Sequence, residues 1–430
     1  MAQTLVFTEP NFTQEFDTLL GAKREASVDV DIIVRDIISD VQKRGDEALL
    51  ELTNKFDRMD IGIDQLRISQ EEIDAALKAV SEVEMEALIL ARDRIKSHHE
   101  RQMPKDDRYT DASGVELGSR WSAIEAVGLY VPGGTASYPS SVLMNAVPAK
   151  VAGCKRIVMV VPTPDGILNP LVLAAANLAG VDEIYRVGGA QAVAALAYGT
   201  DTIKPVYKIV GPGNAFVATA KRQVFGTVGI DMIAGPSEIL VIADEENDPD
   251  WIAIDLLAQA EHDASAQSVL ITDSADFGEA VAVAVTKQLE LLPRKEIASK
   301  SWEDFGAIIV VPSMCEAVAL ANQMAAEHLE IATKDPEAVF ENITNAGAVF
   351  LGRYTPEAIG DYVGGSNHVL PTARSAKFSS GLSTLDFVKR TSILKCGPDQ
   401  LAAIGPAAVT LAKSEGLQAH GKSVSIRMNK

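Results

Sequence analysis

The stretch LLAQAEHDASAQ, residues 256–267, places a side-chain amide and an imidazole three positions apart, at Gln259 and His262. On a helix, residues i and i+3 share one face, so the amide oxygen and a ring nitrogen would point towards the same place. Such a pair supplies two ligands for a metal ion. It is also compatible with a solvated helix face, because Glu261 and Asp263 stand beside it. Further ligands elsewhere in the chain have to decide between the two interpretations.

Histidine is rare in this chain, which has six. His98 and His99 lie in the charged run KSHHERQ and are expected to be solvated. The other four stand in distinctive local settings and are His262, His328, His368 and His420. Each of these, taken singly, can be a hydrogen-bonded structural residue rather than a ligand.

Carboxylates near these histidines favour a metal site over purely structural roles. Asp361 is expected in the Gly-rich loop AIGDYVGG, and Glu415 lies five residues before His420. One amide, one carboxylate and two imidazoles suit a borderline cation such as Zn²⁺. The candidate ligand set is Gln259, His262, Asp361 and His420. Spacing alone does not show that these four side chains meet.

Glu327 and His328 form the best candidate acid–base pair. An imidazole titrates near working pH, so it can take a proton from an alcohol, while the adjacent carboxylate can activate a water. Neighbours on a helix point about 100° apart, so the pair must lie at a helix end or a turn to serve one site. The alternative is an exposed helix end in which only Leu329 is buried.

Three glycine-containing turns follow expected strands, at residues 129–141, 187–192 and 211–216. Gln191 lies in the first turn of the second expected helix, and Asn214 stands just before the third. Backbone N–H groups at such helix starts favour anions. None of the turns is GxGxxG, and each alone can be a tight turn without a ligand. Together, in one parallel sheet, they predict a nucleotide crevice at the carboxyl ends of the strands.

Composition restricts the class of protein. The chain has 430 residues, an apolar fraction of 47% and a formal net charge of −20. This is the composition of a globular protein with more than one core, and the acidic charge argues against nucleic acid as a partner. No apolar run reaches the roughly 18 residues that span a bilayer, and the start MAQTLVFTEPNF lacks signal-peptide features. Three cysteines without a CxxC pair indicate reduced thiols, with Cys154 packed, in a cytoplasmic protein without a membrane partner.

The pattern of apolar residues predicts an α/β fold. Residues 1–28 form a polar N-terminal arm, and residues 30–102 are helical, with a capping box at Ser69 and Glu72. Short apolar strands then alternate with helices, which indicates parallel sheets. The segment CEAVALANQMAAEHLEIAT is expected to be one helix. Strands are expected to end near Ser379, leaving a helical tail that finishes with a short strand, SVSIRM.

The motifs, taken in order, resemble those of the histidinol dehydrogenase family. The resemblance runs from about residue 25 to the end and is carried by GLYVPGG, VGGAQAVAALAYGT, KIVGPGNAFV, IDMIAGPSEILVIAD, DLLAQAEHD, EHLEI, GDYVGGSNHVLPT and EGLQAH. It implies two incomplete Rossmann-like parallel-sheet domains with helical N- and C-terminal extensions. Residues 29–129 and 241–379 would form the domain with the zinc and catalytic residues, 130–240 an inserted NAD-binding domain, and 380–430 a dimer-exchange tail.

The resemblance also implies an activity, which is NAD-linked oxidation of L-histidinol to L-histidine through bound L-histidinal, the last step of histidine biosynthesis. It implies one Zn²⁺ per subunit and a homodimer whose sites are completed by the partner's tail. The zinc ligands would be Gln259, His262, Asp361 and His420, and the acid–base pair Glu327 and His328. NAD contacts would be Tyr130, Gln191 and Asn214, and substrate contacts Ser237 and Glu415 together with the zinc ligands and His328. His368 would have a supporting role.

Other functions remain open at this point. A paralogue with the same zinc and NAD sites can oxidise another small alcohol, such as a sulfonated diol. A zinc hydrolase would use the same ligands without NAD, and a non-catalytic metal-binding or scaffold protein would not need Glu327 and His328. NADH formation from histidinol separates these possibilities.

Overall fold

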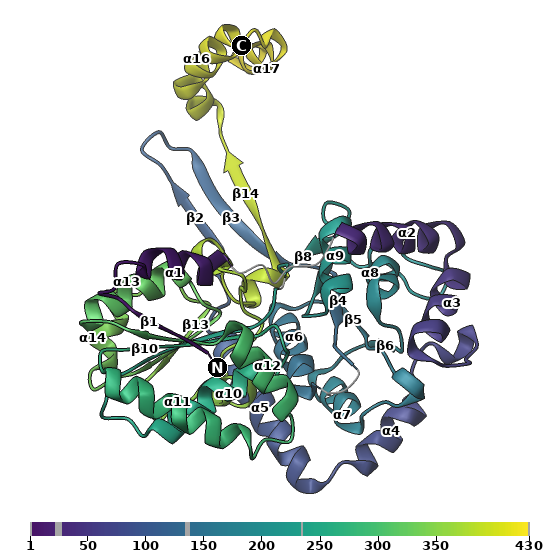
Figure 1. Cartoon of the computed structure of the whole chain (residues 1–430). Helices are drawn as coiled ribbons and strands as arrows, with labels where there is room; N and C mark the ends of the chain where they lie inside the picture. Colours follow the sequence, from purple (N-terminus) through teal and green to yellow (C-terminus); the bar gives the residue numbers. More distant parts are fainter. Residues whose placement is uncertain (1, 22–27, 134–137, 234, 429–430) are drawn as a thin grey trace.

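The computed structural model describes residues 2–21, 28–133, 138–233 and 235–428. These residues form two parallel sheets covered by helices and a third, antiparallel sheet that carries a projecting extension (Figure 1). The predicted α/β fold class is confirmed. Residues 134–137 of the predicted turn at 129–141 lie outside the described residues. None of the described helices is both long and apolar enough to cross a membrane.

The five-stranded sheet has the order β6-β5-β4-β7-β8, with every strand parallel to its neighbours. Its strands are β4 (Ala126–Tyr130), β5 (Arg156–Val160), β6 (Glu183–Tyr185), β7 (Lys208–Val210) and β8 (Gly229–Ile230). Helices α6 (Pro139–Ala152), α7 (Pro170–Ala179), α8 (Gly189–Tyr198) and α9 (Ala215–Val224) connect them, with the short turn η2 (Pro164–Gly166). The chain goes from β4 towards one edge and later returns to add β7 on the other side of β4. The strand order therefore reverses between β4 and β7.

Four helices from the N-terminal third cover this same sheet. They are α2 (Val28–Arg44), α3 (Asp46–Asp57), α4 (Gln70–Ala79) and α5 (Glu82–Glu100), with η1 (Ile63–Gln65) between them. Buried side chains of α2 and α3 join the core beneath α8 and α9, and those of α4 and α5 join the core beneath α6 and α7. This packing differs from the expected assignment of residues 29–129 to the domain of the zinc residues. The predicted capping box is confirmed, because Ser69 N donates to Glu72 Oε2 at 2.9 Å.

The six-stranded sheet has the order β1-β11-β10-β9-β12-β13 and is parallel throughout. Its strands are β1 (Gln3–Val6), β9 (Glu238–Ala243), β10 (Gln267–Thr272), β11 (Ala307–Val310), β12 (His328–Ala332) and β13 (Ala348–Leu351). Its helices are α1 (Phe12–Gly21), α10 (Pro249–Ala260), α11 (Ala275–Leu289), α12 (Lys295–Phe305), α13 (Met314–Met324), α14 (Pro336–Phe340) and α15 (Glu357–Tyr362). The N-terminal arm thus supplies an edge strand rather than a polar appendage.

The helix expected over CEAVALANQMAAEHLEIAT is wrong in its second half. Helix α13 ends at Met324, Ala325 adopts the left-handed conformation with φ 47°, and β12 begins at His328. All five residues of β12 are buried. The five residues of β12 are too few for their periodicity to distinguish a short strand from a continuation of the helix.

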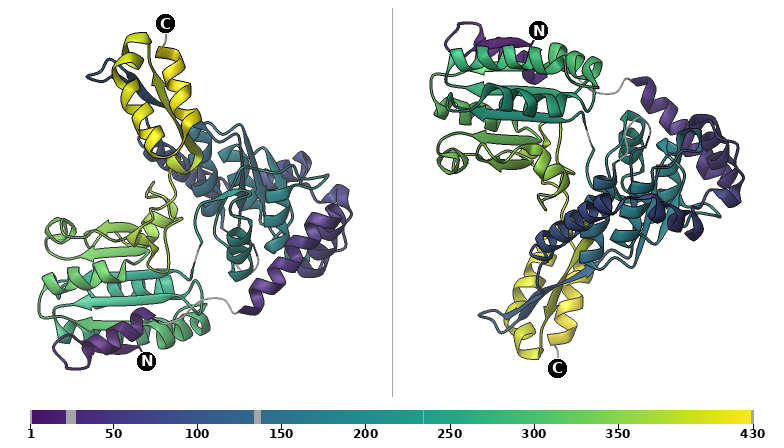
Figure 2. Two further views of the ribbon diagram at one scale, coloured as in Figure 1. Left: turned by 90° about the horizontal axis from the view of Figure 1, so that it is seen from above. Right: turned by 90° about the horizontal axis from the view of Figure 1, so that it is seen from below.

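A third sheet forms the base of the projecting extension (Figures 1 and 2). Its antiparallel strands are β2 (Asp107–Thr110), β3 (Glu116–Ala123) and β14 (Val388–Lys395), reached through η3 (Ser375–Lys377) and η4 (Thr384–Phe387). It ends in α16 (Pro398–Ser414) and α17 (Gln418–Met428). Two predictions are therefore wrong, since a strand follows Ser379 and SVSIRM is helical. Gly405 lets α17 pack closely on α16, because a Cβ there would lie 2.5 Å from Met428 Sδ.

Candidate active site

The predicted acid–base pair, Glu327 and His328, lies at the amino end of the parallel strand β12. His328 is the first residue of β12 and pairs in register with Ile239 of the adjacent β9. Ser237 directly precedes β9. Helix α10 connects two parallel neighbours, so it runs back along the sheet and its C-terminal end returns to this same edge. That end carries Gln259.

His328 is buried as a neutral base. Its Nδ1 lies 3.1 Å from the carbonyl oxygen of Glu238, which can only accept, so the proton is assigned to Nδ1 and the lone pair to Nε2. Nε2 is buried and has no hydrogen-bond partner among the described residues. Burial lowers the pKa of His328 to about 3, so the ring is neutral at neutral pH. The arrangement leaves one basic nitrogen available to a reacting hydroxyl.

Carboxylates stand on the protonated side of the same ring. Glu327 Oε2 lies 3.7 Å from His328 Nδ1 and Glu357 Oε1 lies 3.3 Å from it. Glu327 Oε2 also accepts a hydrogen bond of 3.0 Å from the backbone N–H of Glu238, which fixes its orientation. An imidazolium formed by proton uptake at Nε2 would face the carboxyl groups of Glu327 and Glu357 across Nδ1–H. Burial disfavours the charged ring, and a carboxylate beside Nδ1 opposes that effect when it is ionised.

A histidine–carboxylate cluster surrounds this pair. Ligand atoms of His328, Glu357 and Asp361 lie within 4.8 Å of one another. Asp361 belongs to α15, so its expected placement in a loop is wrong. Burial raises the pKa of Asp361 to about 7, and burial together with the charge of Asp361 raises that of Glu357. A divalent cation would favour the charged form of both.

Glu357 is the residue of this cluster that the sequence interpretation missed. It is buried, and it stands four positions before Asp361 in PEAIGDY. On a helix this spacing places both carboxylates on one face. Recognition of α15 as a helix rather than a loop would have supplied the signal.

Gln259 and His262 lie near this cluster. Gln259 is buried in the last turn of α10, and its Oε1 has no hydrogen-bond partner within the described part of the chain. His262 follows the helix end; its ring reaches solvent, yet desolvation by neighbouring atoms lowers its pKa. Its charge also lowers the pKa values of His328 and His368. Because α10 contacts α15, which carries Asp361, a buried amide oxygen without a partner among the described residues fits a metal ligand set.

His368 contacts two neighbours at the site. Its Nδ1 lies 3.8 Å from Asp361 Oδ1, and its Nε2 lies 3.3 Å from Ser141 Oγ. Burial, followed by the charge of His262, lowers the pKa of His368 to about 4. These contacts make it a neighbour of Asp361 rather than a distant structural residue.

The expected solvation of the histidine pair in α5 is wrong for His99. Its ring is fully buried, and Nδ1 lies 2.7 Å from Ile95 O. Its Nε2 lies 3.4 Å from the side-chain amide of Asn367, the residue before His368. The charged residues around it suggested a wet surface, but the apolar positions of α5 set which face is buried.

The two predicted site residues of the tail lie elsewhere. Glu415 and His420 are exposed on α16–α17, at the far end of the extension (Figure 1). Within one chain they are therefore not brought to Asp361. Large apolar side chains of the extension are also exposed, and these are Leu394, Ile404, Leu411, Leu417 and Ile426.

The residues predicted to contact a nucleotide gather at the other sheet. Tyr130 is the last residue of β4, and its hydroxyl accepts a 3.0 Å hydrogen bond from the N–H of Gly189 at the start of α8. Gln191 is buried in that first turn. Asn214 caps α9, accepting from Phe216 N and Val217 N. All lie at carboxyl ends of strands, and Tyr130 and Asn214 follow β4 and β7, between which the strand order reverses and where α/β sheets bind ligands.

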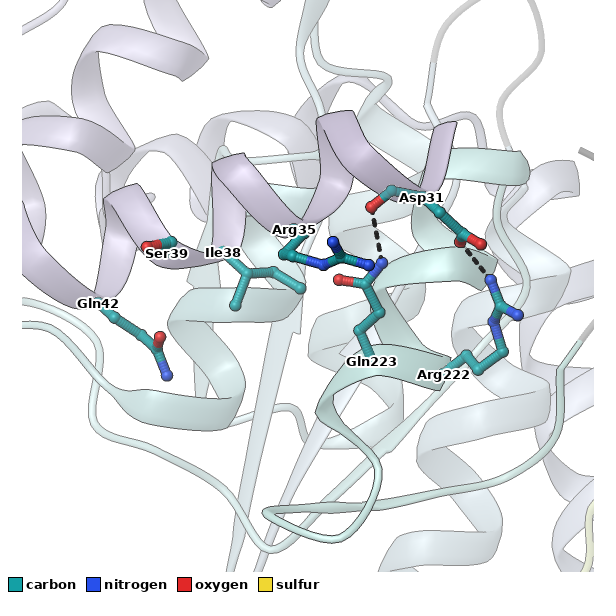
Figure 3. A pocket seen from close by; sticks show the side chains of 7 residues that line it. All are labelled: Asp31, Arg35, Ile38, Ser39, Gln42, Arg222 and Gln223. Atoms are coloured by element: carbon teal, nitrogen blue, oxygen red, sulfur yellow. Dashed lines mark hydrogen bonds and ion pairs between the residues drawn. The ribbon is translucent and has the colours of Figure 1, made fainter. Parts of the chain in front are cut away.

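A cavity of about 520 Å³ opens between α2 and α9 and shares no lining residue with either cluster (Figure 3). Its charged lining is partly paired, because Arg222 forms an ion pair with Asp31. Gln223 Nε2 donates to the backbone oxygen of Asp31 at 2.9 Å. These contacts fasten the outer face of α9 to α2.

Fold and site together define an α/β protein with two functional parallel sheets. A buried base and a candidate cation site lie at one of them. Helix N-termini that suit an anion lie at the other. A sequence profile of histidinol dehydrogenase matches residues 21–428. Histidinol dehydrogenase of Agrobacterium fabrum is 68% identical over 429 residues, covering 100% of this chain and 99% of the relative. That of Brucella suis is 66% identical, covering 100% of both chains. The chain belongs to the histidinol dehydrogenase family of oxidoreductases.

The fold agrees with a solved structure of the same family. The crystal structure of histidinol dehydrogenase from Elizabethkingia anophelis superimposes with a TM-score of 0.94 at 38% sequence identity. The match covers 99% of this chain and 98% of that one, so it includes both sheets and the extension.

Proposed function

We propose that this chain oxidises L-histidinol to L-histidine in two successive NAD-linked steps, through L-histidinal that stays bound, as the last step of histidine biosynthesis. The observation that carries the proposal is the buried, neutral His328, whose Nε2 has no partner among the described residues and whose Nδ1 lies near the carboxyl groups of Glu327 and Glu357. Membership of the histidinol dehydrogenase family supports the choice of substrate.

Gln259, His262 and Asp361 would hold one Zn²⁺, with His420 supplied by a second copy of the chain. The unpartnered Oε1 of Gln259 and the closeness of Asp361 to His328 support this set. Bound zinc supplies a template that holds the amino and imidazole nitrogens of histidinol without redox chemistry of its own. His368, beside Asp361, would help to orient that carboxylate.

In the first oxidation, His328 Nε2 takes the hydroxyl proton of histidinol. Bound NAD⁺ would supply the hydride acceptor for each oxidation. The Nδ1–H of His328 stays directed at Glu238 O, and Glu327 and Glu357 stabilise the imidazolium. Ser237 and Glu415 would contact the substrate and keep its hydroxyl beside Nε2.

In the second oxidation, Glu327 takes a proton from a water that attacks the aldehyde carbon and returns a proton to the former aldehyde oxygen, which gives the hydrate. His328 then takes the hydroxyl proton of the hydrate as the second hydride leaves, and the carboxylic acid dissociates. The overall change consumes one histidinol, one water and two NAD⁺, and yields histidine, two NADH and three protons. Burial of Glu327 and His328 restricts water near the reacting carbon to the molecule that is used.

Tyr130, Gln191 and Asn214 would bind NAD at the carboxyl ends of β4 to β7. The N-termini of α8 and α9 suit the pyrophosphate, because their backbone N–H groups and helix dipoles favour anions. The link between Tyr130 and Gly189 supports a pre-formed crevice.

A homodimer with exchanged tails would complete each site with Glu415 and His420 from the other copy. The exposed position of both residues, and the exposed apolar side chains of the extension, support this arrangement. A second copy that covers the extension would bury these side chains.

The test is the rate of NADH formation from L-histidinol compared with a panel of small alcohols that includes a sulfonated diol. The proposal expects the highest kcat/KM for L-histidinol. A higher kcat/KM for a sulfonated diol would instead assign to the chain the activity of a paralogue.

A further inference from the structure

An ion pair is buried inside the five-stranded-sheet region, away from the histidine cluster. Lys221 of α9 pairs with Asp231, which follows β8. Their side chains are 2% and 1% exposed. Lysine and aspartate are rarely buried to this extent, and such a pair is no more stabilising than well-packed apolar side chains. Its presence calls for a role other than general stability.

Both partners bond to the backbone of one residue, Gly211. Lys221 Nζ donates to Gly211 O at 2.9 Å, and Asp231 Oδ2 accepts from Gly211 N at 2.8 Å. The pair therefore satisfies the peptide groups on both sides of Gly211. Asp231 is fixed in turn, because its own N–H donates to Ile209 O at 3.2 Å and its Oδ1 accepts from Met232 N at 2.7 Å.

Gly211 begins the turn GPGN (residues 211–214), which leads to Asn214 at the start of α9. Its φ of +114° lies in the region that favours glycine, and a Cβ there would lie 2.1 Å from Tyr130 O. The turn thus packs directly on the backbone of Tyr130, whose hydroxyl reaches Gly189 and the start of α8. Through Gly211, the ion pair contacts the turn on which two of the three expected nucleotide contacts depend.

We propose that the Lys221–Asp231 ion pair positions the GPGN turn for binding of the dinucleotide, so that Lys221 and Asp231 are positioning residues for the cofactor. The inference rests on the proposed NAD-linked function. An apolar pair of similar volume would leave Gly211 N–H and C=O buried without partners, and the turn would have to shift to reach water. Such a shift would misplace Asn214 relative to Tyr130.

The test compares variants of the full-length, zinc-loaded protein by fluorescence titration with NADH and by steady-state kinetics. Lys221→Met/Asp231→Asn removes the pair without leaving a net buried charge. Lys221→Arg keeps the charge and a donor, and serves as the conservative variant. Arg222→Met is the matched control, because Arg222 is the next residue of α9 and its ion pair with Asp31 lies on the outer face (Figure 3).

The double variant is expected to lose NADH affinity by about tenfold or more, the effect of misplacing hydrogen bonds to a charged ligand. KM for NAD rises by a similar factor, while KM for histidinol and kcat at saturating NAD stay within about twofold. Arg222→Met keeps the parent values, and Lys221→Arg recovers part of the loss. Should the double variant not fold by circular dichroism, Lys221→Arg alone, which keeps the pair's charges but alters the reach of the donor, is expected to show a smaller loss in the same direction.

Unchanged NADH affinity in a folded double variant, or an equal loss in Arg222→Met, would overturn the positioning role. A fall in melting temperature without a change in KM for NAD would also overturn it, since that is the result of a purely structural pair. If the parent protein itself binds no NADH, the proposed function fails first, and the control titration of the parent distinguishes that case.

Discussion

The two parallel sheets present their functional residues at opposite ends. In the five-stranded sheet, Tyr130 and the GPGN turn lie at carboxyl ends of strands, beside the N-termini of α8 and α9. In the six-stranded sheet, Glu327 and His328 lie at amino ends, beside the C-terminal end of α10. The same α/β architecture thus exposes two different electrostatic environments.

The difference follows from the direction of the helix dipole. Helix N-termini carry partial positive charge and unpaired N–H groups, which suit a pyrophosphate. Helix C-termini carry partial negative charge, which suits a cation. Gln259 closes α10 at that negative end, and Asp361 adds a carboxylate from the last turn of α15. In the proposed mechanism, one sheet would hold the anionic cofactor and the other the metal and the base.

Loss of the metal should have the largest effect on turnover of histidinol. It should leave NADH binding at the other sheet nearly unchanged. Metal-stripped protein, or Asp361→Asn, is expected to lose more than about a hundredfold in kcat/KM for histidinol, because the substrate has no template. NADH affinity measured by fluorescence should stay within about twofold, since Tyr130 and Asn214 belong to the other sheet. Recovery of turnover with Zn²⁺ completes the measurement. A parallel loss of NADH affinity would contradict the separation.

Replacement of the base should have the next largest effect. His328→Asn removes the lone pair at Nε2, and general-base catalysis is worth about 10²–10⁴ in rate. Both oxidations should slow by a similar factor when histidinol and histidinal are assayed separately. Zinc content, measured by atomic absorption, should equal that of the parent. Normal turnover of either substrate would show that another group removes the proton.

Glu327→Gln should act unequally on the two oxidations. The carboxylate is proposed to activate water only in the second, so aldehyde oxidation should fall by about 10²-fold and alcohol oxidation by less. The ratio of the two rates, rather than either alone, is the measurement. Glu357→Gln is the matched control, since it removes the other carboxylate near Nδ1 and should slow both steps alike. Equal losses in Glu327→Gln would argue against the water-activating role.

Gly211→Ala should have the smallest effect on turnover and act on the cofactor alone. A Cβ at Gly211 would meet Tyr130 O at 2.1 Å, so the turn must shift, and NADH affinity should fall by about tenfold. Gly226→Ala is the control, because Gly226 has φ +104° but nothing within 4 Å of a Cβ. Both changes should cost about 1–2 kcal/mol of unfolding free energy through backbone strain. Equal NADH affinity in the two variants would contradict the claim that a Cβ at Gly211 displaces the turn.

Local signals predicted much of the fold. The Ser69–Glu72 capping box is a short-range feature, and it is present. The alternation of short apolar strands and helices was sufficient for two parallel sheets. Helix α17 was misread because its residues alternate like a strand, whereas its packing on α16 decides its structure.

The site was less accessible to sequence reasoning, because it depends on contacts between distant segments. Spacing indicated that Gln259 and His262 belong together, but the position of His328 at a strand start required the pairing of β9 with β12. Glu357 was missed because α15 was taken for a loop. His420 lies on a helix of the extension, so no single chain brings it to Asp361.

The most direct test is the number of NADH molecules formed per molecule of L-histidinol at limiting substrate, with metal-stripped protein measured beside the zinc-loaded protein. The account predicts a yield of about two, lost with the metal and restored by Zn²⁺, because one base carries out both oxidations at one site. A yield of one, with free histidinal accumulating, would contradict the bound intermediate. No NADH from histidinol, with zinc in place, would contradict the assigned reaction.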